Sequence, residues 1–154
     1  MDATFWGQLG AVLCLGLAAL GSSFGIKAAG QAAAGAWARD ARAGTGLRFN
    51  YVIFIGAPIS QTFYAMIVMN QMKAALADPR LAAAQAGLLF GIGLATGLGE
   101  LGSAWGQGLI GAAACRCLSE GEGKGLAFLL IAIGIVETVG IFTMVFLLGM
   151  LPRA

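Results

Sequence analysis

Residues 126–151 read LAFLLIAIGIVETVGIFTMVFLLGML, an apolar run with one charged side chain, Glu137, near its middle. The run is long enough to cross a bilayer, because a transmembrane helix needs about 20 mainly apolar residues. An acidic group at the bilayer centre costs roughly 2.5–3.5 kcal/mol on insertion scales, so it tends to persist where it faces protein, pairs or binds an ion. No Lys or Arg lies in this run. We therefore interpret Glu137 as a functional group whose partners lie in other segments.

The composition of the whole chain agrees with a membrane protein. Of its 154 residues, 59% are apolar and only 10% are charged, whereas a soluble domain is about one quarter charged. The chain has no His, which excludes His-based metal sites and His general bases. A net charge of +2 does not indicate a nucleic-acid partner. No Gly-x-x-x-x-Gly-Lys-Ser/Thr loop is present, so we expect a protein that is not itself an enzyme.

Four apolar stretches predict four transmembrane helices, at about residues 5–36, 49–73, 83–115 and 125–151. The first of them has no basic residue before its apolar part, so we interpret it as a retained helix and not as a signal peptide. The first and third connecting loops together hold five Lys or Arg residues, against three on the other side, where Arg153 is counted. By the positive-inside rule we expect these two loops in the cytoplasm and both termini outside.

The four spans form two copies of one pattern. GSSFGIKAAGQAAAG, which begins at Gly21, aligns without a gap with GSAWGQGLIGAAACR, which begins at Gly102, at an offset of 81 residues. PISQTFYAM, from Pro58, aligns with GIVETVGIF, from Gly134, at an offset of 76 residues. Internal repeats of this kind indicate a duplicated unit. The sequence therefore predicts an all-α membrane protein of two helical hairpins, residues 1–76 and 77–154.

Small residues form stripes along the first and third spans. The third span repeats a small residue every four positions, at Gly87, Gly91, Ala95, Gly99 and Ser103. The first span has a shorter stripe, at Gly21, Gly25 and Ala29. Such stripes let helices approach closely in lipid, where van der Waals contact drives association. Two interpretations stay open: tight packing inside a four-helix bundle, or an inner wall of helices around a ring axis.

Polar groups on the second span are candidate partners of Glu137. At the 76-residue offset, Gln61 takes the position of Glu137. Pro58 has no N–H, so we expect it to loosen the local turn and to free backbone oxygens near Ala57. Ser60 and Gln61 add further oxygens. A carboxylate surrounded by neutral oxygens is typical of a site for a hard cation. The alternative is ordinary hydrogen bonding between membrane helices.

With these motifs, the chain resembles the proteolipid rotor subunit of V-type (A/V-type) ATPases, the double-hairpin c or K subunit. The resemblance covers essentially the whole chain and is strongest to the sodium-binding kind, through PISQTFY at Pro58–Tyr64, WGQG around Gln107 and VET around Glu137. It implies a homo-oligomeric ring of about ten copies, closed by one repeated interface. It also implies contact with membrane lipid, a stator subunit that supplies an arginine, and central-stalk subunits, with ATP hydrolysed in a separate catalytic head.

The resemblance also implies the roles of individual residues. Glu137 would carry one ion, Na⁺ in preference to H⁺, as the transported species, and no permanent cofactor is expected. Tyr64 and Thr138 would support the ligands without touching the ion, Tyr64 by a hydrogen bond to Glu137. Ser60 stands where the sodium-binding members have Thr, and it keeps the hydroxyl. The implied Na⁺ ligands are the carbonyl of Ala57 and the side chains of Ser60, Gln61, Gln107 and Glu137.

Two other functions remain as alternatives: a small four-helix proton-coupled transporter, and a structural or pore-forming membrane proteolipid. Two charged residues lie outside the resemblance. Glu100 lies seven residues before Gln107 and therefore on the same helix face. It is interpreted as a second ion group, an acid that faces the bore of the ring, or a protonated contact between helices. Lys27, in the first span, is interpreted as a side chain that extends toward a wetter zone.

Overall fold

The computed structural model describes residues 4–152, and these residues contain helices and no strand. The helices follow the predicted order along the chain. They are α1 (Phe5–Arg42), α2 (Tyr51–Gly56), the 3₁₀ helix η1 (Ala57–Ile59), α3 (Ser60–Leu76), α4 (Pro79–Ala84), α5 (Ala86–Glu120) and α6 (Leu126–Gly149).

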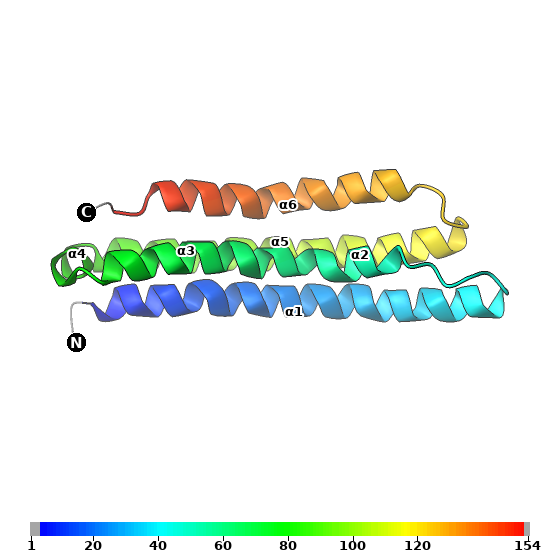
Figure 1. Cartoon of the computed structure of the whole chain (residues 1–154), viewed down its shortest axis with the longest axis horizontal. Helices are drawn as coiled ribbons and strands as arrows, with labels where there is room; N and C mark the ends of the chain where they lie inside the picture. The colour runs from blue at the N-terminus through cyan, green and yellow to red at the C-terminus, as the bar shows by residue number, and fades with distance from the viewer. Residues whose placement is uncertain (1–3, 153–154) are drawn as a thin grey trace.

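Four helical segments are long and apolar enough to cross a membrane, which confirms the predicted all-α class and number of spans. They are α1, the segment Tyr51–Leu76 made of α2, η1 and α3, α5 and α6. Figure 1 shows them side by side along one axis, with α4, the start of α1 and the end of α6 at the same end of the bundle. Helix α1 continues to Arg42 and α5 to Glu120, past the predicted ends of their spans. Arg, Lys and Glu are good helix formers, so a helix readily continues beyond its apolar part.

The closest packing in the fold joins α1 and α5, the equivalent helices of the two repeats. A Cβ atom on Gly93 would collide with the backbone of Gly10, and one on Gly108 would collide with the backbone of Gly25. Any residue larger than Gly at these crossings would push the two backbones apart. Both pairs are separated by 83 residues, close to the 81-residue offset of the repeat, so the two helices pack almost in register.

The small-residue stripe of α5 is only partly used inside the chain. Gly99 packs against Thr143 of α6, whereas Gly87 and Gly91 have no neighbour within 4 Å. In contrast, the α1 residues Gly21 and Gly25 both pack against α5. Bundle packing therefore accounts for the stripe on α1, while the first part of the α5 stripe lies on an exposed face.

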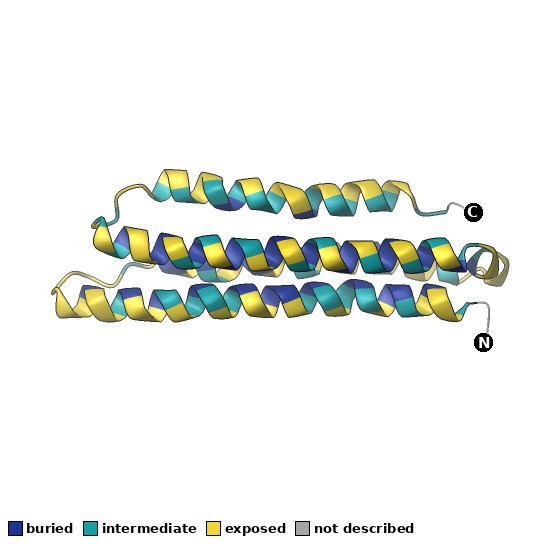
Figure 2. Ribbon diagram, turned by 180° about the vertical axis from the view of Figure 1, so that it is seen from behind, coloured by how far each residue is buried: buried dark blue, intermediate teal, exposed yellow. Residues whose placement is uncertain are grey.

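Helix α6 covers the bundle with little of its own surface buried. Only Ile133 and Gly140 are buried in this helix, and Figure 2 shows its surface as mostly exposed or intermediate. Its exposed side chains are largely apolar, including Phe128, Ile131 and Phe146. This surface is suited to contact with lipid.

The two ends of the bundle differ in charge. At the end that holds the first and third loops, Arg48 pairs with the buried Asp40 at 2.6 Å, and Tyr51 donates a hydrogen bond to the same carboxylate at 2.9 Å. On the surface nearby, Arg39 pairs with Glu120 at 2.8 Å. These contacts tie the first loop to α1 and to the end of α5. The cytoplasmic position of this end stays a prediction.

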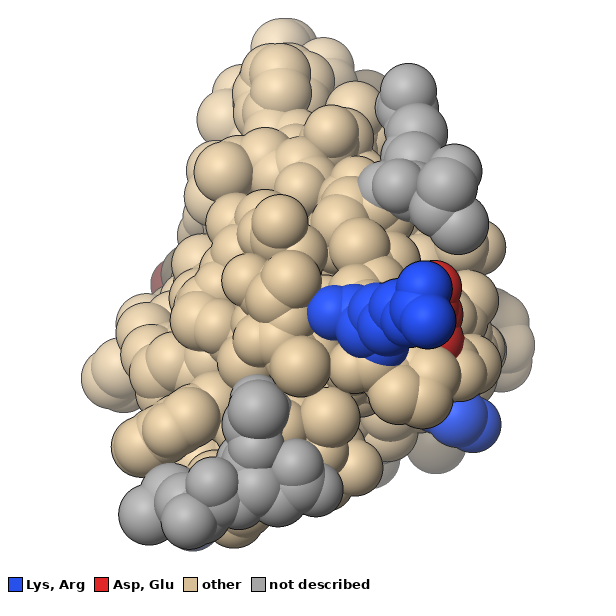
Figure 3. All heavy atoms as spheres, turned by 90° about the vertical axis from the view of Figure 1, so that its left-hand side faces the viewer, with Lys and Arg blue, Asp and Glu red and all other residues tan. Residues whose placement is uncertain are grey.

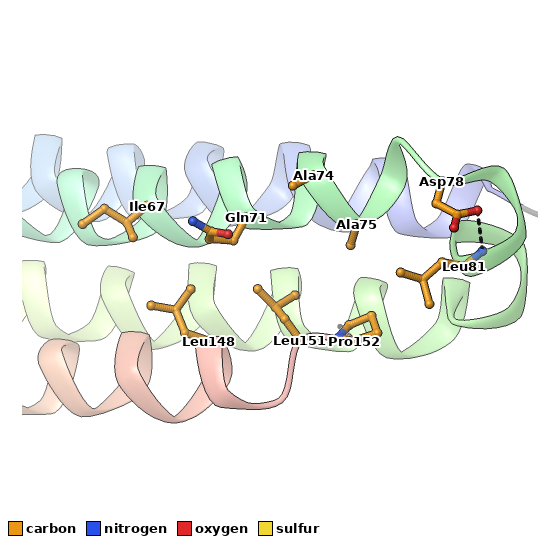
Figure 4. A pocket seen from close by; sticks show the side chains of 9 residues that line it. All are labelled: Ile67, Gln71, Ala74, Ala75, Asp78, Leu81, Leu148, Leu151 and Pro152. Carbon is orange, nitrogen blue, oxygen red and sulfur yellow. Dashed lines mark hydrogen bonds between the residues drawn. The ribbon is translucent and has the colours of Figure 1, made fainter. Parts of the chain in front are cut away.

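Among the residues that the structure describes, the opposite end shows only a few charged groups (Figure 3). Arg153, which entered the prediction of topology, lies outside the described residues. A pocket at this end, drawn in Figure 4, lies between α3, the start of α4 and the end of α6. Its acid, Asp78, accepts hydrogen bonds from the backbone N–H groups of Arg80 and Leu81 and so caps α4. None of the predicted ion ligands lines this pocket.

Candidate functional site

The second span changes its helical geometry at Pro58. Here η1 separates α2 from α3, and the backbone N–H of Ser60 reaches the carbonyl of Ala57 in a 3₁₀ pattern. The hydroxyl of Ser60 donates to the same carbonyl at 2.9 Å. The expectation of a loosened turn was therefore wrong, because the chain tightens into a 3₁₀ turn in response to the missing N–H. Ser22 of α1 donates to the Pro58 carbonyl at 2.6 Å and anchors this turn.

Two amide side chains meet next to this turn. Gln61 Nε2 donates to Ser60 Oγ at 3.3 Å and to Gln107 Oε1 at 3.4 Å. Both glutamines are completely buried, Gln61 on α3 and Gln107 on α5. Gln61 Oε1 and Gln107 Nε2 have no hydrogen-bond partner among the residues that the structure describes. Polar atoms buried without partners are costly, so they mark a place where a further ligand or proton is expected.

The carboxylate of Glu137 is held from α3. Tyr64 donates its hydroxyl hydrogen to Glu137 Oε1 at 2.8 Å, and Glu137 itself is only half-buried. Helix α6 is fixed against α5 close by, because Ser103 donates to the Val136 carbonyl at 2.9 Å. A Cβ on Gly106 would lie 3.1 Å from the Val136 side chain, so a small residue there lets the helices approach.

The predicted residues thus fall into two hydrogen-bonded groups. Ala57, Ser60, Gln61 and Gln107 form one chain of hydrogen bonds, and Tyr64 and Glu137 form the other. Helix α3 supplies residues to both groups, one turn apart, and η1 supplies Ala57, α5 supplies Gln107 and α6 supplies Glu137. No hydrogen bond in the described part of the chain joins the Glu137 carboxylate to either amide.

Two of the charged or polar residues named above lie away from these groups. Thr138 is exposed and donates to the carbonyl of Ile135 in its own helix at 2.6 Å. Lys27 is also exposed, and it borders a surface hollow with Phe24, Gln31 and Trp105. Neither side chain shares a described hydrogen bond with the residues of the two groups.

Glu100 and Gly140 also belong to this region; the sequence placed Glu100 on the same helix face as Gln107, but it gave no role to Gly140. Glu100 is completely buried inside a single chain, so the interpretation that it faces the bore of a ring is wrong. A Cβ on Gly140 would collide with Gln61 Oε1 and lie 2.6 Å from Glu100 Oε2. The available signal was the repeat itself, since Gly140 aligns with Tyr64 at the 76-residue offset. A Gly in place of a large side chain leaves room for neighbouring groups.

The arrangement offers a carboxylate, amide oxygens, a hydroxyl and a backbone carbonyl on three spans, a donor set suited to a hard cation. In a comparison with protein families, the family model of the ATP synthase C subunit matches the chain twice, over residues 9–72 and 90–150. The first match contains the residues of α3 described above, and the second contains Gln107 and Glu137. A search of curated protein sequences found no match.

Proposed function

Because the chain belongs to the family of ATP synthase C subunits, we propose that it is the rotor-ring proteolipid of a V-type ATPase and carries one Na⁺ per subunit on Glu137. Proteins of this family are membrane subunits that move ions and do not themselves catalyse ATP chemistry. They assemble into oligomeric rings with other subunits of the ATPase.

The double hairpin supports the V-type assignment. The family pattern occurs twice within one chain. At one aligned position the first repeat has Gln61 and the second repeat has the acid Glu137. The two repeats have therefore diverged at the polar position while keeping their packing. One ion site per four helices is the simplest consequence of this divergence.

One observation carries the ion-binding proposal: helix α3 contacts both the half-buried acid of α6 and the buried glutamine of α5, through side chains that lie one turn apart. Tyr64 holds Glu137 at 2.8 Å, and one turn away on α3 the side chain of Gln61 reaches Gln107. Sodium would take oxygens from the Ala57 carbonyl and from Ser60, Gln61, Gln107 and Glu137. Carboxylate and neutral oxygens are the ligands that hard cations prefer.

The proposed cycle depends on the charge of Glu137. With Na⁺ bound, the carboxylate is neutralised and passes the lipid at low cost. Without Na⁺, the charged carboxylate is expensive in lipid and stays at the stator, where an arginine pairs with it. Rotation driven from the catalytic head then moves loaded sites through the bilayer. We place the first and third loops on the cytoplasmic side, toward the central stalk, and both termini on the other side.

The packing of α1 on α5 supports assembly into a ring. Gly10 and Gly21 of α1 pack against α5, and their equivalents at the 81-residue offset are Gly91 and Gly102. Neither Gly91 nor Gly102 has a neighbour within 4 Å in its own chain. The same interface is thus available for α1 of a second copy. Head-to-tail interfaces form a ring when their rotation returns to the first copy, and here we propose that it does so after about ten copies.

Binding of ²²Na⁺ to purified rings tests this proposal. We expect about one Na⁺ per subunit in the wild type and at least tenfold weaker binding in Gln107→Ala, because one ligand is lost. Gln71→Ala is the matched control, since Gln71 is an exposed glutamine on α3. Wild-type rings that retain no Na⁺, and that instead bind protons on Glu137, would show that the cargo is H⁺.

A further inference from the structure

Ser22 of α1 joins the first span to the 3₁₀ turn of the second span. Its hydroxyl donates to the Pro58 carbonyl at 2.6 Å, and its oxygen lies 2.8 Å from the hydroxyl of Thr62. Because the single hydroxyl hydrogen of Ser22 goes to Pro58, Thr62 is the donor in the second bond. Ser22 itself is buried. These two bonds attach both the turn and the start of α3 to α1.

Ser103 of α5 makes the equivalent contact in the second repeat. It aligns with Ser22 at the 81-residue offset, in the segments GSAWG and GSSFG. Its hydroxyl donates to the Val136 carbonyl of α6 at 2.9 Å, and Ser103 is also buried. In each hairpin, therefore, a buried serine of the first helix holds a backbone carbonyl of the second helix.

The two carbonyls that accept these bonds lie directly beside proposed Na⁺ ligands. Pro58 follows Ala57, whose own carbonyl is a proposed ligand, and Val136 precedes Glu137. Neither serine has a described hydrogen bond to a proposed ligand. Each serine can therefore act on the ligands only through the backbone, one residue away in both cases.

The two serines belong to one rigid pair of helices. The backbones of Gly25 and Gly108 meet close by, three residues after Ser22 and five residues after Ser103. Close-packed contacts of this kind resist compression and transmit displacement. Helices α1 and α5 therefore act as a common frame, to which the second span and α6 are each attached by a serine.

Helix α6 depends on Ser103 in particular. Within the described residues, two hydrogen bonds join α6 to the other spans: Tyr64 donates to Glu137, and Ser103 donates to the Val136 carbonyl. The second bond is the one that involves the backbone of α6, so it remains when the Glu137 carboxylate changes its partner. Little of the surface of α6 is buried, so this bond has a large share in fixing its position along α5.

We propose that Ser22 and Ser103 are positioning residues that set the size of the ion site and, with it, the preference for Na⁺ over the smaller Li⁺. Ser22 fixes the Ala57 side of the site and Ser103 fixes the Glu137 side, both relative to the frame of α1 and α5. A site whose two sides are held apart cannot contract around a smaller cation without losing a hydrogen bond.

This inference rests on the proposed function and adds a basis for selectivity to it. The types of ligand do not discriminate between Na⁺ and Li⁺, because both are hard cations that prefer oxygen. Selection between hard cations depends on the size and flexibility of the cavity. The two serines control these properties without touching the ion.

The test measures the dissociation constants of Na⁺ and Li⁺ on the same purified rings, by displacement of bound ²²Na⁺. We expect Ser22→Ala and Ser103→Ala each to lower the ratio of the Li⁺ constant to the Na⁺ constant by about threefold to tenfold, the range that one hydrogen bond supplies. The double variant should lower this ratio further. Ser23→Ala is the matched control, since Ser23 is an exposed neighbour that donates to Ala19 in its own helix, and it should leave the ratio unchanged.

The ratio separates positioning from stability. Rings that are merely less stable lose sites for Na⁺ and Li⁺ in equal number, so the ratio of the two constants does not change. If an alanine variant does not assemble, the cysteine variant at the same position takes its place, because Cys is similar to Ser in size and only a weak donor. We expect the same fall in the ratio.

Each contrary result has a defined meaning. An unchanged ratio in one of these variants, with normal Na⁺ binding in the wild type, rejects the positioning role of that serine and leaves the proposed function intact. Wild-type rings that bind Li⁺ at least as tightly as Na⁺ reject the proposed size preference. Wild-type rings that bind neither ion reject both the inference and the proposed sodium transport.

Discussion

At the scale of single residues, the site depends on a missing side chain as much as on the polar groups present. Gly140 leaves the space in which Gln61 Oε1 and Glu100 Oε2 lie. In the first repeat the aligned position is Tyr64, whose hydroxyl instead reaches Glu137. The two aligned positions therefore serve the same site in different ways: Gly140 leaves space for other side chains, and Tyr64 donates a hydrogen bond.

We predict that Gly140→Ala weakens Na⁺ binding about tenfold and leaves the fold intact. The new methyl group meets the ends of two flexible side chains, so the backbone does not have to move. Overpacking of this kind costs typically 1–3 kcal/mol. Ion coordination needs a closely defined position of the amide, whereas the ion-free site tolerates a shifted Gln61.

Titration of purified rings with ²²Na⁺ measures this effect, and circular dichroism reports the helix content. Gly134→Ala is the matched control on α6, because an added Cβ there has no neighbour within 4 Å. Equal Na⁺ affinities in the two variants would contradict the placement of Gln61 next to Gly140.

At the scale of helices, the contact between α1 and α5 is the main determinant of the fold. The crossing of Gly25 and Gly108 brings two backbones together with no side chain between them. The second span is positioned against the same contact, because a Cβ on Gly25 would also lie 2.8 Å from Pro58. The geometry of the 3₁₀ turn, and with it the position of Ser60, thus depends on glycine in α1.

We predict that Gly108→Ala lowers the stability of the chain by about 1–3 kcal/mol, because two helix backbones must separate to admit the methyl group. Unfolding in a titration with sodium dodecyl sulfate, followed by circular dichroism, measures the change. Gly56→Ala serves as the comparison, since an added Cβ there meets nothing within 4 Å and Ala is the better helix former. Equal stability of the two variants would refute the close crossing.

At the scale of the whole molecule, one chain leaves an interface unused. The glycines of α1 that pack on α5 align, at the 81-residue offset, with Gly91 and Gly102 of α5. These two aligned glycines are exposed. Conversely, Gly97 of α5 packs against α1, whereas Gly16, the aligned residue of α1, has no neighbour within 4 Å. Each chain thus presents both halves of the contact that it already makes internally, which is the condition for head-to-tail assembly.

We predict that Gly91→Leu prevents ring closure and leaves the single chain folded. The added side chain has free space within its own chain but blocks the approach of α1 from the next copy. Native mass spectrometry in mild detergent should show monomers or open oligomers in place of one large species. Gly134→Leu, on the lipid-facing helix α6, should still form complete rings. Rings of normal size in Gly91→Leu would exclude this face as the interface between copies.

The sequence by itself determined the class of the protein, its four spans and its duplication, because length, apolar character and internal alignment are local properties of the chain. It also indicated Glu137 and the polar residues of α3 as candidates, since charge in an apolar span is visible without a structure. Their role in sodium binding stays a prediction.

Only the tertiary structure decided which side chains meet. Glu100 lies seven residues from Gln107 on one helix face, yet its neighbour is Gln61 on another helix, through the space at Gly140. The 3₁₀ turn at Pro58 and the unused half of the α1–α5 contact depend likewise on how helices cross. The physical reason is that the rotation and crossing of each helix are set by contacts between distant segments. In lipid those contacts depend on the fit of small residues, and the hydropathy of the sequence does not show which face of a helix makes them.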